Sequence, residues 1–324
     1  MSTVKPRKDS LVDFIEKFSR EDHQINFFLN LKWPNGFSCD KCECHDYYLV
    51  KRKNVKSGYL LVCKKCGHQH SLLANTIFQD SNLPLIKILI GLYIFFSSNN
   101  GVNGNQLANY MDVNVKTARK FSKKCRILMA ESNNLKTLQN SFYEIDILEI
   151  GGHHTGKRGK GSENKQPTLL VLSTFEDNEY PQYIKLHTLP NYKGEPIENY
   201  LKEKCIFNAS TVINCDGDRA FLRLEKLTQL ENSIVDYTNE NHKLRWLNTF
   251  AGNIQSNIYH LYRSVKKRDL PLFLAEQEWR TNHRYSGKNI MKKVMKYISM
   301  SKPITFKQIT NSVRTYEKQF LLTK

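Results

Sequence analysis

Four cysteines in two identical spacings are the residues of this chain best suited to chemistry. Cys39 and Cys42 form one Cys-x-x-Cys pair, and Cys63 and Cys66 form a second pair after twenty intervening residues. Each pair aims two thiolates at one point, and two pairs complete the tetrahedral four-sulfur site that suits Zn²⁺. A thioredoxin-like redox motif would need one Cys-x-x-Cys in a βαβ setting, which the sequence lacks. The spacing therefore predicts a structural zinc site.

Neighbouring residues leave the exact set of zinc ligands open. Cys44, His45, His68 and His70 lie close enough in sequence to replace one of the four cysteines. The stretch between the two pairs, YYLVKRKNVKSGYLLV, is typical of two strands joined by a turn. We therefore expect a zinc ribbon. Its metal either holds a small domain together or also supports contact with DNA.

Two aspartates stand at strand positions where a charge is expensive to bury. Asp146 lies inside the apolar stretch YEIDILEI, and Asp216 follows the apolar stretch VINC. A buried carboxylate is costly unless it is paired or bound to metal. Two of them on adjacent strands would suit Mg²⁺ or Mn²⁺ in phosphodiester chemistry, where one metal activates the attacking oxygen and another stabilises the leaving oxygen. Exposed or salt-bridged acids are the simpler alternative.

The charge balance favours nucleic acid as the partner. The chain has 324 residues, with 49 Lys and Arg against 31 Asp and Glu, and a net charge of +18. Basic side chains that neutralise phosphates release counterions, which strengthens binding. An anionic membrane surface is the rival partner. The most apolar stretch, LPLIKILIGLYIFF, is too short to span a bilayer and predicts a buried helix.

The N-terminal sequence has no secretory signal, so we expect reduced cysteines. The protein would be cytoplasmic and nucleoid-associated, or nuclear in a eukaryotic host. The fold class is α+β with several domains. We expect an N-terminal helical segment (1–36), the zinc ribbon (37–72), a helix-turn-helix DNA-binding domain (73–135), a mixed α/β domain (140–285) and a basic helical C-terminal tail (286–324).

The helix-turn-helix is predicted from residues 101–130. A short helix with Leu107 and Met111 inward precedes a turn, and a second helix follows with apolar residues at helical spacing. In such a unit the second helix enters the major groove of DNA. Two helices and a turn are also a common structural arrangement. The residues expected to face DNA are Asn114, Lys116, Thr117 and Lys120.

The region after residue 140 predicts three strands, a helix and a fourth strand, which is typical of a mixed α/β layer. A polar, basic loop (153–167) separates the first two strands. Its basic side chains would either grip phosphates near the carboxylates or remain solvated. They are Lys157, Arg158, Lys160 and Lys165.

The ordered set of motifs resembles bacterial insertion-sequence transposases of the zinc-ribbon class, to which eukaryotic Merlin elements are related. It runs over roughly residues 10–285 and includes CKKCGHQHSLLANTIFQDSNLPL, GVNGNQLANYMDVNVKTARK, IDILEIGG, INCDGDRAF and LRWLNTFAGN. The resemblance implies a ribonuclease H-like catalytic domain whose triad cuts and rejoins DNA. Asp146 and Asp216 match the first two family aspartates.

The third position departs from the commoner family pattern, which has Glu on the following helix. No Asp or Glu occurs from Asn241 to Arg268. One branch of the family has Asn after a Trp-Leu-His-Thr-x-x-Ser-Asn stretch, and WLNTFAGN resembles it, with Asn248 for the His and Gly252 for the Ser. The resemblance therefore implies Asn253 as the third ligand of Mg²⁺ or Mn²⁺, with Gln255 as the fallback if a family Glu has been lost.

The resemblance implies a DNA transposase that acts on the terminal inverted repeats of its element and on target DNA. We expect it to work as a homo-oligomer on double-stranded DNA, with no membrane partner. A catalytically silent, repurposed transposase that only binds DNA is the first alternative. A nuclease on the same fold without strand transfer is the second.

Overall fold

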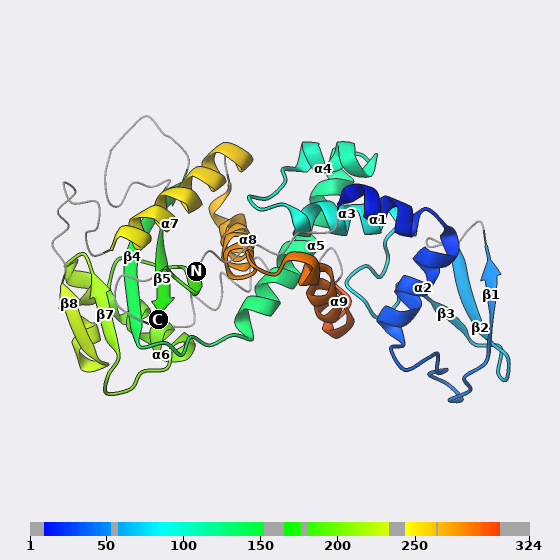
Figure 1. Ribbon diagram of the computed structural model, residues 1–324, viewed down its shortest axis with the longest axis horizontal. Helices are drawn as coiled ribbons and strands as arrows, with labels where there is room; N and C mark the ends of the chain where they lie inside the picture. The colour runs from blue at the N-terminus through cyan, green and yellow to red at the C-terminus, as the bar shows by residue number, and fades with distance from the viewer. Residues whose placement is uncertain are drawn as a thin grey trace. The chain divides into compact units, whose positions relative to one another are not determined.

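The computed structural model of the chain describes residues 10–52, 58–151, 165–175, 180–232, 244–263 and 265–304. The chain divides into two compact units, which we describe separately (Figure 1). The first unit contains the described residues up to Leu128 and those from Arg284 onward. The second unit contains the described residues between Met129 and His283.

The first unit begins with two short helices and a small sheet. Helix α1 (Leu11–Phe18) starts with a capping box between Ser10 and Asp13, as in many helix N-termini, and α2 (Glu21–Lys32) follows directly. Strands β1 (Tyr47–Lys51), β2 (Tyr59–Cys63) and β3 (Gln69–Ser71) form an antiparallel sheet in the order β1-β2-β3. This is the strand pattern expected of a ribbon.

Helix α3 (Leu85–Ser97) is the buried centre of the first unit, as its apolar sequence predicted. It contacts α1, α2, α4 (Gly104–Met111) and α9 (Ile290–Met300). Helix α9 buries Ile290, Val294 and Ile298, so this part of the expected tail packs into the core of the first unit. The rest of the expected tail, from residue 305 onward, lies outside the described residues. Among the described helices, none has the length and hydropathy needed to cross a membrane.

Helices α4 and α5 (Val115–Asn134) are joined by a tight turn. Asn103 caps the start of α4, and Asp112 ends it in the left-handed conformation with φ of 48°. The ammonium group of Lys87 on α3 lies 2.8 Å from the Asp112 carboxylate, which ties the turn to the core helix. Asn114 accepts a hydrogen bond from the Lys116 amide at 2.8 Å and so caps the first turn of α5.

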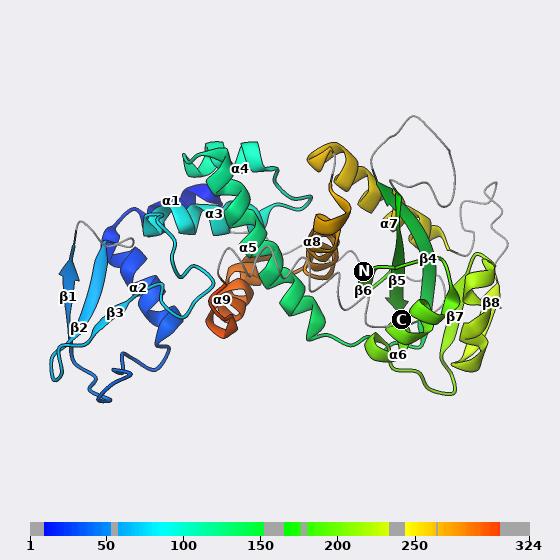
Figure 2. The same ribbon diagram turned by 180° about the vertical axis from the view of Figure 1, so that it is seen from behind.

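The second unit is built on a five-stranded mixed sheet in the order β6-β5-β4-β7-β8 (Figure 2). Strands β4 (Phe142–Gly151), β5 (Lys165–Thr174) and β6 (Tyr183–Thr188) are antiparallel neighbours. Strands β7 (Val212–Cys215) and β8 (Gln229–Asn232) run parallel to β4 on its other side. The sequence predicted four of these strands and missed β8.

Helices cover both faces of this sheet. Helix α6 (Gly194–Lys204) and the 3-10 helix η1 (Arg219–Lys226) pack with the odd-numbered residues of β4, including Tyr143 and Ile145. Helix α7 (Arg245–Ser256) and α8 (Leu270–Asn282) pack with its even-numbered residues Leu148 and Ile150. Figure 1 shows α7 lying along β4 and β5. Short helical turns complete the chain: η2 (Asn257–Leu261), η3 (Lys267–Asp269) and η4 (Gly287–Asn289).

The close approach of α6 and η1 depends on Gly194. A Cβ atom at this position would lie 2.5 Å from the carbonyl oxygen of Ala220 and 2.9 Å from Arg223. Backbone atoms cannot yield as a flexible side-chain end can, so a side chain here would force the two helices apart. Because η1 begins just after Asp216, this contact also fixes the end of β7.

We predict that Gly194→Ala lowers the stability of the protein by about 1–3 kcal/mol through overpacking. Gly252→Ala on α7 is the matched control, because a Cβ atom there would meet no atom within 4 Å. Helix propensity alone should make this control neutral or more stable by about 0.5–1 kcal/mol. Thermal unfolding followed by circular dichroism measures both. Equal transition temperatures for the two variants would contradict the proposed packing constraint.

Candidate active site and zinc centre

The four cysteines predicted as zinc ligands lie together in the ribbon. The sulfur atoms of Cys39, Cys42, Cys63 and Cys66 all lie within 4.8 Å of one another. The Sγ atoms of Cys39 and Cys66 are 3.6 Å apart, and those of Cys42 and Cys63 are 3.5 Å apart. Tetrahedral Zn–S bonds of about 2.3 Å place sulfurs roughly 3.8 Å apart, so the donor set fits Zn²⁺.

Backbone amides favour the thiolate form of Cys63. Burial would raise the pKa of the Cys63 thiol, but hydrogen bonds from the Cys66 and Lys65 amides and from neighbouring thiols lower it to about 6. The first cysteine of each Cys-x-x-Cys pair also accepts a backbone hydrogen bond. The Glu43 amide donates to the Cys39 carbonyl at 2.9 Å, and the Gly67 amide donates to the Cys63 carbonyl at 3.0 Å. Each Cys-x-x-Cys turn is therefore fixed by its own backbone.

The other candidate zinc ligands have different partners. The thiol of Cys44 lies 3.9 Å from the Asp46 carbonyl oxygen, and Nδ1 of His45 lies 2.8 Å from that of Phe37. His70 is buried beside the cluster, with Nε2 at 3.4 Å from the Cys39 sulfur and Nδ1 at 3.5 Å from an Asp40 oxygen. Burial lowers the pKa of His70, so its ring is neutral and orients the Cys39 sulfur.

The register of the large sheet brings Asp146 and Asp216 to adjacent positions. Strands β4 and β7 pair in parallel, and the last pair joins Ile145 to Cys215. Asp146 and Asp216 each follow by one residue, and neighbouring strands lie about 4.8 Å apart. Both are even-numbered positions on the face that α7 covers. Asp146 is half-buried and Asp216 is exposed, so one side of the pair is open to solvent.

Local hydrogen bonds fix the turn that follows β7. The carboxylate of Asp216 accepts from the amide of Asp218 at 3.1 Å, and the carboxylate of Asp218 accepts from the amide of Ala220 at 3.0 Å. Gly217 between them has φ of +79°, a conformation that favours glycine. The INCDGDRAF motif thus forms a strand end, a tight turn and the start of η1.

A buried glutamate that the sequence analysis did not single out holds α7 against β4. Glu144 is 2 % exposed, two residues before Asp146 on the same face of the strand. Its carboxylate accepts a hydrogen bond from the amide of Leu247 at 3.2 Å. A negative charge at a helix N-terminus is favourable because it meets unpaired amides and the positive end of the helix dipole. The alternation of YEIDILEI already placed both acids on one face.

Helix α7 has two flanks, and their contacts differ. Trp246 and Phe250 pack against Tyr180, with ring centroids at 4.7 and 5.9 Å, and Asn257 donates to Gln277 of α8 at 3.2 Å. At 3.6 residues per turn, Asn253 lies on this same flank, which faces β6 and α8. Its side chain is exposed.

The opposite flank of α7 carries Asn248, Gly252 and Gln255. The amide of Gln255 donates to the carbonyl of Glu149 at 3.5 Å. Glu149 pairs with Pro167 of β5, and the Pro167 carbonyl accepts a hydrogen bond from the Leu189 amide beside β6. The Pro167 carbonyl therefore points away from β4. In an antiparallel pair the two carbonyls point either toward each other or apart, so the Glu149 carbonyl points away from β5, to the β7 side. The flank with Gln255 therefore faces the side of β4 where Asp216 lies. The buried Nδ2 of Asn248 has no hydrogen-bond partner among the described residues.

Two further acids of the second unit are already paired. Glu276 is fully buried and accepts hydrogen bonds from Arg280 at 2.6 Å and from the Tyr262 hydroxyl at 2.9 Å. Glu149 lies on the odd-numbered face of β4 and is bound by Lys165 and the Tyr192 hydroxyl, each at 2.8 Å. Neither carboxylate faces Asp146.

The residues expected to contact DNA are divided between described and undescribed parts of the chain. Lys116 and Lys120 are exposed on α5, Asn114 is exposed and caps that helix, and Thr117 is half-buried. Lys165 begins β5 and pairs with Glu149. The remaining loop candidates, Lys157, Arg158 and Lys160, lie outside the described residues.

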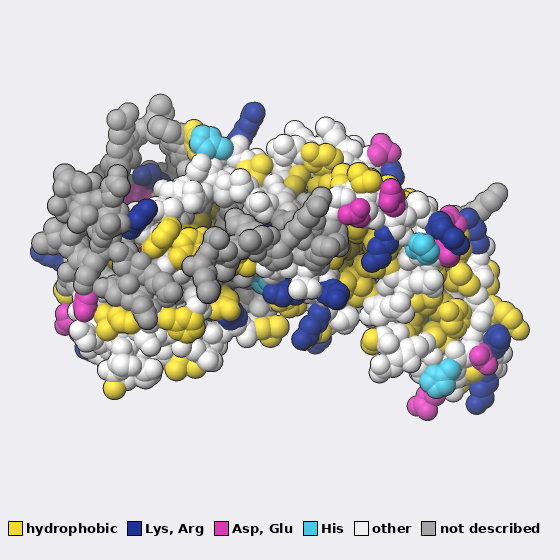
Figure 3. Space-filling model, in the orientation of Figure 1, with side chains coloured by type: hydrophobic (Ala, Val, Ile, Leu, Met, Phe, Trp, Pro, Cys, Tyr) yellow, Lys and Arg dark blue, Asp and Glu magenta, His cyan; other side chains and the backbone are white. Residues whose placement is uncertain are grey.

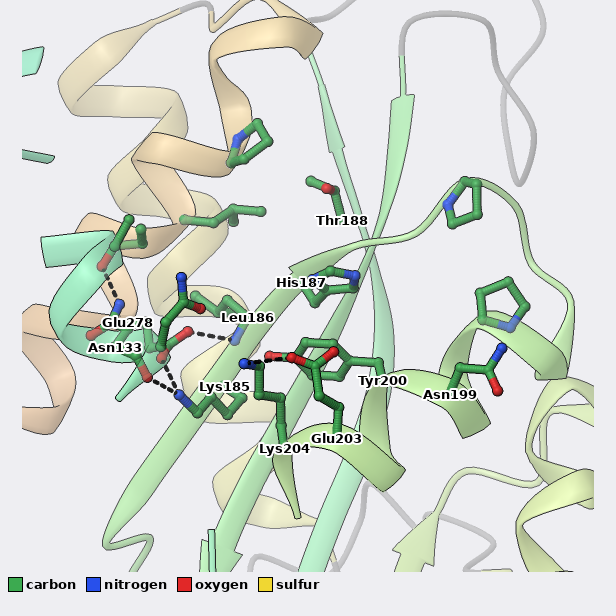
Figure 4. A pocket seen from close by; sticks show the side chains of 17 residues that line it. Asn133, Lys185, Leu186, His187, Thr188, Asn199, Tyr200, Glu203, Lys204 and Glu278 are labelled. Carbon is green, nitrogen blue, oxygen red and sulfur yellow. Dashed lines mark hydrogen bonds and ion pairs between the residues drawn. The ribbon is translucent and has the colours of Figure 1, made fainter. Parts of the chain in front are cut away.

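A cavity of about 550 Å³ in the second unit lies at the β6 edge of the sheet rather than at the aspartates (Figure 4). Its charged groups are paired: Lys185 with Glu278 at 3.1 Å, and Lys204 with Glu203 at 2.8 Å. Glu278 also accepts from the Leu186 amide at 3.0 Å and so covers the open edge of β6. Burial lowers the pKa of His187 to about 3, which keeps its ring neutral. This cavity serves the fold.

Comparisons with known proteins agree with this architecture. Residues 19–69 match a transposase zinc-ribbon domain, and residues 140–282 match an ISXO2-like transposase domain. An uncharacterized protein in the transposable element ISH50 of Halobacterium salinarum is 26 % identical over 296 residues, which cover 87 % of this chain and 98 % of that protein. The matches confirm the resemblance found in the sequence to insertion-sequence transposases that carry a zinc ribbon.

Proposed function

We propose that the protein is a DNA transposase that binds the terminal inverted repeats of its element and catalyses metal-dependent strand cleavage and strand transfer. The pairing of β4 with β7 carries this proposal, because it sets Asp146 beside Asp216 on one face of the transposase domain. The strand order β6-β5-β4-β7-β8, with helices on both faces, supports a ribonuclease H-like fold for this domain.

The two aspartates would hold a divalent cation, Mg²⁺ or Mn²⁺. Their donor set fits, since carboxylate oxygens are preferred ligands of these hard cations. The bound metal would supply activation of the attacking oxygen and stabilisation of the leaving oxygen. Asp146 is fixed by the centre of the sheet, and Asp216 by the turn that leads into η1. Glu144 positions α7 over this face without contacting the substrate.

For the third position, the contacts of α7 favour Gln255 over Asn253. Gln255 lies on the flank that faces the β7 side of β4, whereas Asn253 shares a flank with Trp246 and Phe250. A carbonyl can only accept a hydrogen bond, so the Glu149 carbonyl takes the amide nitrogen of Gln255. The amide oxygen is then the free end, and oxygen is the atom that a hard cation requires.

The first unit would recognise DNA. Helices α4 and α5 have the arrangement of a helix-turn-helix, and Lys116 and Lys120 are exposed at the start of α5. We propose that this helix enters the major groove and that the ribbon supports it. Lys157, Arg158 and Lys160 are proposed phosphate contacts near the catalytic face. Copies of the protein on the two element ends would form the working assembly in the cell compartment that holds the DNA.

A catalytically silent, repurposed transposase is the second candidate. One observation favours it: no Asp or Glu occurs from Asn241 to Arg268, the stretch that contains α7. An amide ligand brings no charge and binds a cation more weakly than a carboxylate. One measurement distinguishes the two candidates: an active transposase would cleave DNA that carries the element ends when metal is present, and a silent one would not.

We predict that Cys63→Ser releases zinc and unfolds the ribbon, because structural zinc contributes about 10–16 kcal/mol of folding free energy in small zinc peptides. Metal analysis of the purified protein and limited proteolysis measure both effects. Cys44→Ser is the matched control, since that thiol lies outside the sulfur cluster, and it should retain zinc. Wild-type protein without zinc, or equal zinc content in the two variants, would sink the assignment.

We predict that Asp146→Asn and Asp216→Asn each reduce strand cleavage at least about a hundredfold, because several kcal/mol of metal stabilisation are lost. DNA affinity should stay equal or rise, since one negative charge near phosphate is removed. Gel assays with labelled element ends measure cleavage and binding together. Glu203→Gln on α6 is the control, an acid whose side chain is 69 % exposed and remote from the paired positions. Substantial cleavage by Asp216→Asn would remove the central assignment.

We predict that Gln255→Ala reduces cleavage at least about tenfold, whereas Asn253→Ala on the other flank changes it less than about threefold. Gln255→Glu should restore a charged ligand and lower the Mg²⁺ concentration needed for half-maximal cleavage. Metal titrations of cleavage by the three variants measure this. The reverse pattern, with Asn253→Ala inactive and Gln255→Ala active, would assign the third position to Asn253 as the resemblance implies.

A further inference from the structure

A second cavity of the transposase domain, about 470 Å³, opens at the end of β4 beside α7. It is formed by Glu149–Gly151 of β4, Lys165 at the start of β5, the last turns of α7 with the π-helical turn η2, and four residues that follow: Arg263, Val265, Lys267 and Leu270. Its volume is in the range of pockets that bind small molecules, roughly 300–1,000 Å³. Gln255 lines it, so the cavity adjoins the proposed catalytic face.

The cavity is electropositive. Its basic lining residues are Lys165, His260, Arg263 and Lys267, and Glu149 is the one acid among the described residues of its wall. Lys165 and Tyr192 already bind both oxygens of Glu149. Within the described part of the chain, neither Arg263 nor Lys267 forms an ion pair, and both are exposed. Figure 3 shows histidine and basic side chains projecting at the C-terminal end of α7. An anionic group is the complementary ligand.

An aromatic ring and an apolar floor accompany these charges. Tyr259 is 48 % exposed, and its ring lies 5.2 Å from that of His260. Ile150, Ile258 and Leu270 form apolar wall beneath them. Cationic groups together with an exposed aromatic ring are what proteins use to hold single-stranded nucleic acid, where phosphates meet the charges and bases stack on the ring.

The backbone around the cavity is unusual. The turn Asn257–Leu261 is π-helical, and such turns occur frequently at functional sites. Arg263 has φ of +58°, a left-handed conformation that non-glycine residues rarely adopt. Both features turn the chain so that Tyr259, His260 and Arg263 line one cavity.

We propose that this cavity binds one unpaired nucleotide of the DNA strand that passes the catalytic face. Arg263 and Lys267 bind its phosphate, and Tyr259 stacks on its base. The cavity starts three residues beyond Asp146 on β4, about 10 Å along the strand. A base in a duplex is paired and stacked on its neighbours, so the base that enters must be unpaired. The inference rests on the proposed function, since it takes DNA as the substrate of this domain.

Gly252 offers a way to fill the cavity without disturbing the protein. It lines the wall, and a Cβ atom there would meet no atom within 4 Å. Gly252→Trp adds an indole at the cavity wall and is intended to fill the cavity, and Gly252→Ala is its matched control. Tyr259→Ala removes the stacking ring. Its control is Tyr285→Ala, because that tyrosine is 47 % exposed in the first unit.

The test compares binding of the full chain to a blunt DNA duplex and to the same duplex with a short 3′ single-stranded extension, without Mg²⁺. We expect wild-type protein and both controls to prefer the extended duplex by about tenfold, as stacking of a base implies. Gly252→Trp and Tyr259→Ala should reduce this preference below about twofold. An extension of abasic nucleotides should remove the preference of wild-type protein.

Three results would overturn the proposal. The first is that wild-type protein shows no preference for the extended duplex. The second is a full preference in Tyr259→Ala or in Gly252→Trp, when the variant has wild-type thermal stability. The third is a full preference of wild-type protein for the duplex with the abasic extension. Binding is measured without the catalytic metal, so its outcome is independent of cleavage. If Asp216→Asn still cleaves DNA while the extension preference depends on Tyr259, the catalytic assignment fails and the cavity assignment stands.

Discussion

The two-residue alternation of β4 is the constraint on which the transposase domain depends. Strand β4 lies between β5 and β7, and helices cover both of its faces. Its odd-numbered residues meet α6 and η1, and its even-numbered residues meet α7. A shift of one residue would exchange the two faces, placing Asp146 under α6 and Tyr143 under α7. The apolar residues on both sides of Asp146 therefore fix the direction of its carboxylate.

The buried carboxylate of Glu144 extends this constraint from the strand to the helix. Burial of an unpaired charge is costly, but here the charge meets the amide of Leu247 at the start of α7. The rest of α7 is set by contacts at its two ends: Trp246 against Tyr180, and Gln255 against the Glu149 carbonyl. The rotation of the helix follows from these contacts, and our proposal for the third site residue rests on that rotation.

The sequence predicted the zinc cluster and the strand positions of both aspartates, because each depends on local spacing. Cysteine pairs two residues apart form one knuckle whatever surrounds them, and an acid in an apolar strand stands out. The third position depends on the rotation of α7, which its own sequence does not determine. WLNTFAGN places Asn253 by motif, yet the packing of Tyr180 decides which flank faces β4. Strand β8 was missed because QLEN is short and polar and forms only by pairing with β7.

In the proposed site, an amide in place of a third carboxylate would change the charge of the face that carries Asp146 and Asp216 as well as its ligand set. With three carboxylates, repulsion between the face and the DNA phosphates would be balanced only by bound metal. With two, the repulsion is smaller, and the net charge of +18 of the whole chain attracts DNA in either case. The protein would then bind DNA more readily before the metal than a three-carboxylate relative. The basic cavity beside Gln255 would strengthen this order of binding, because the groups proposed to hold the DNA strand there need no metal.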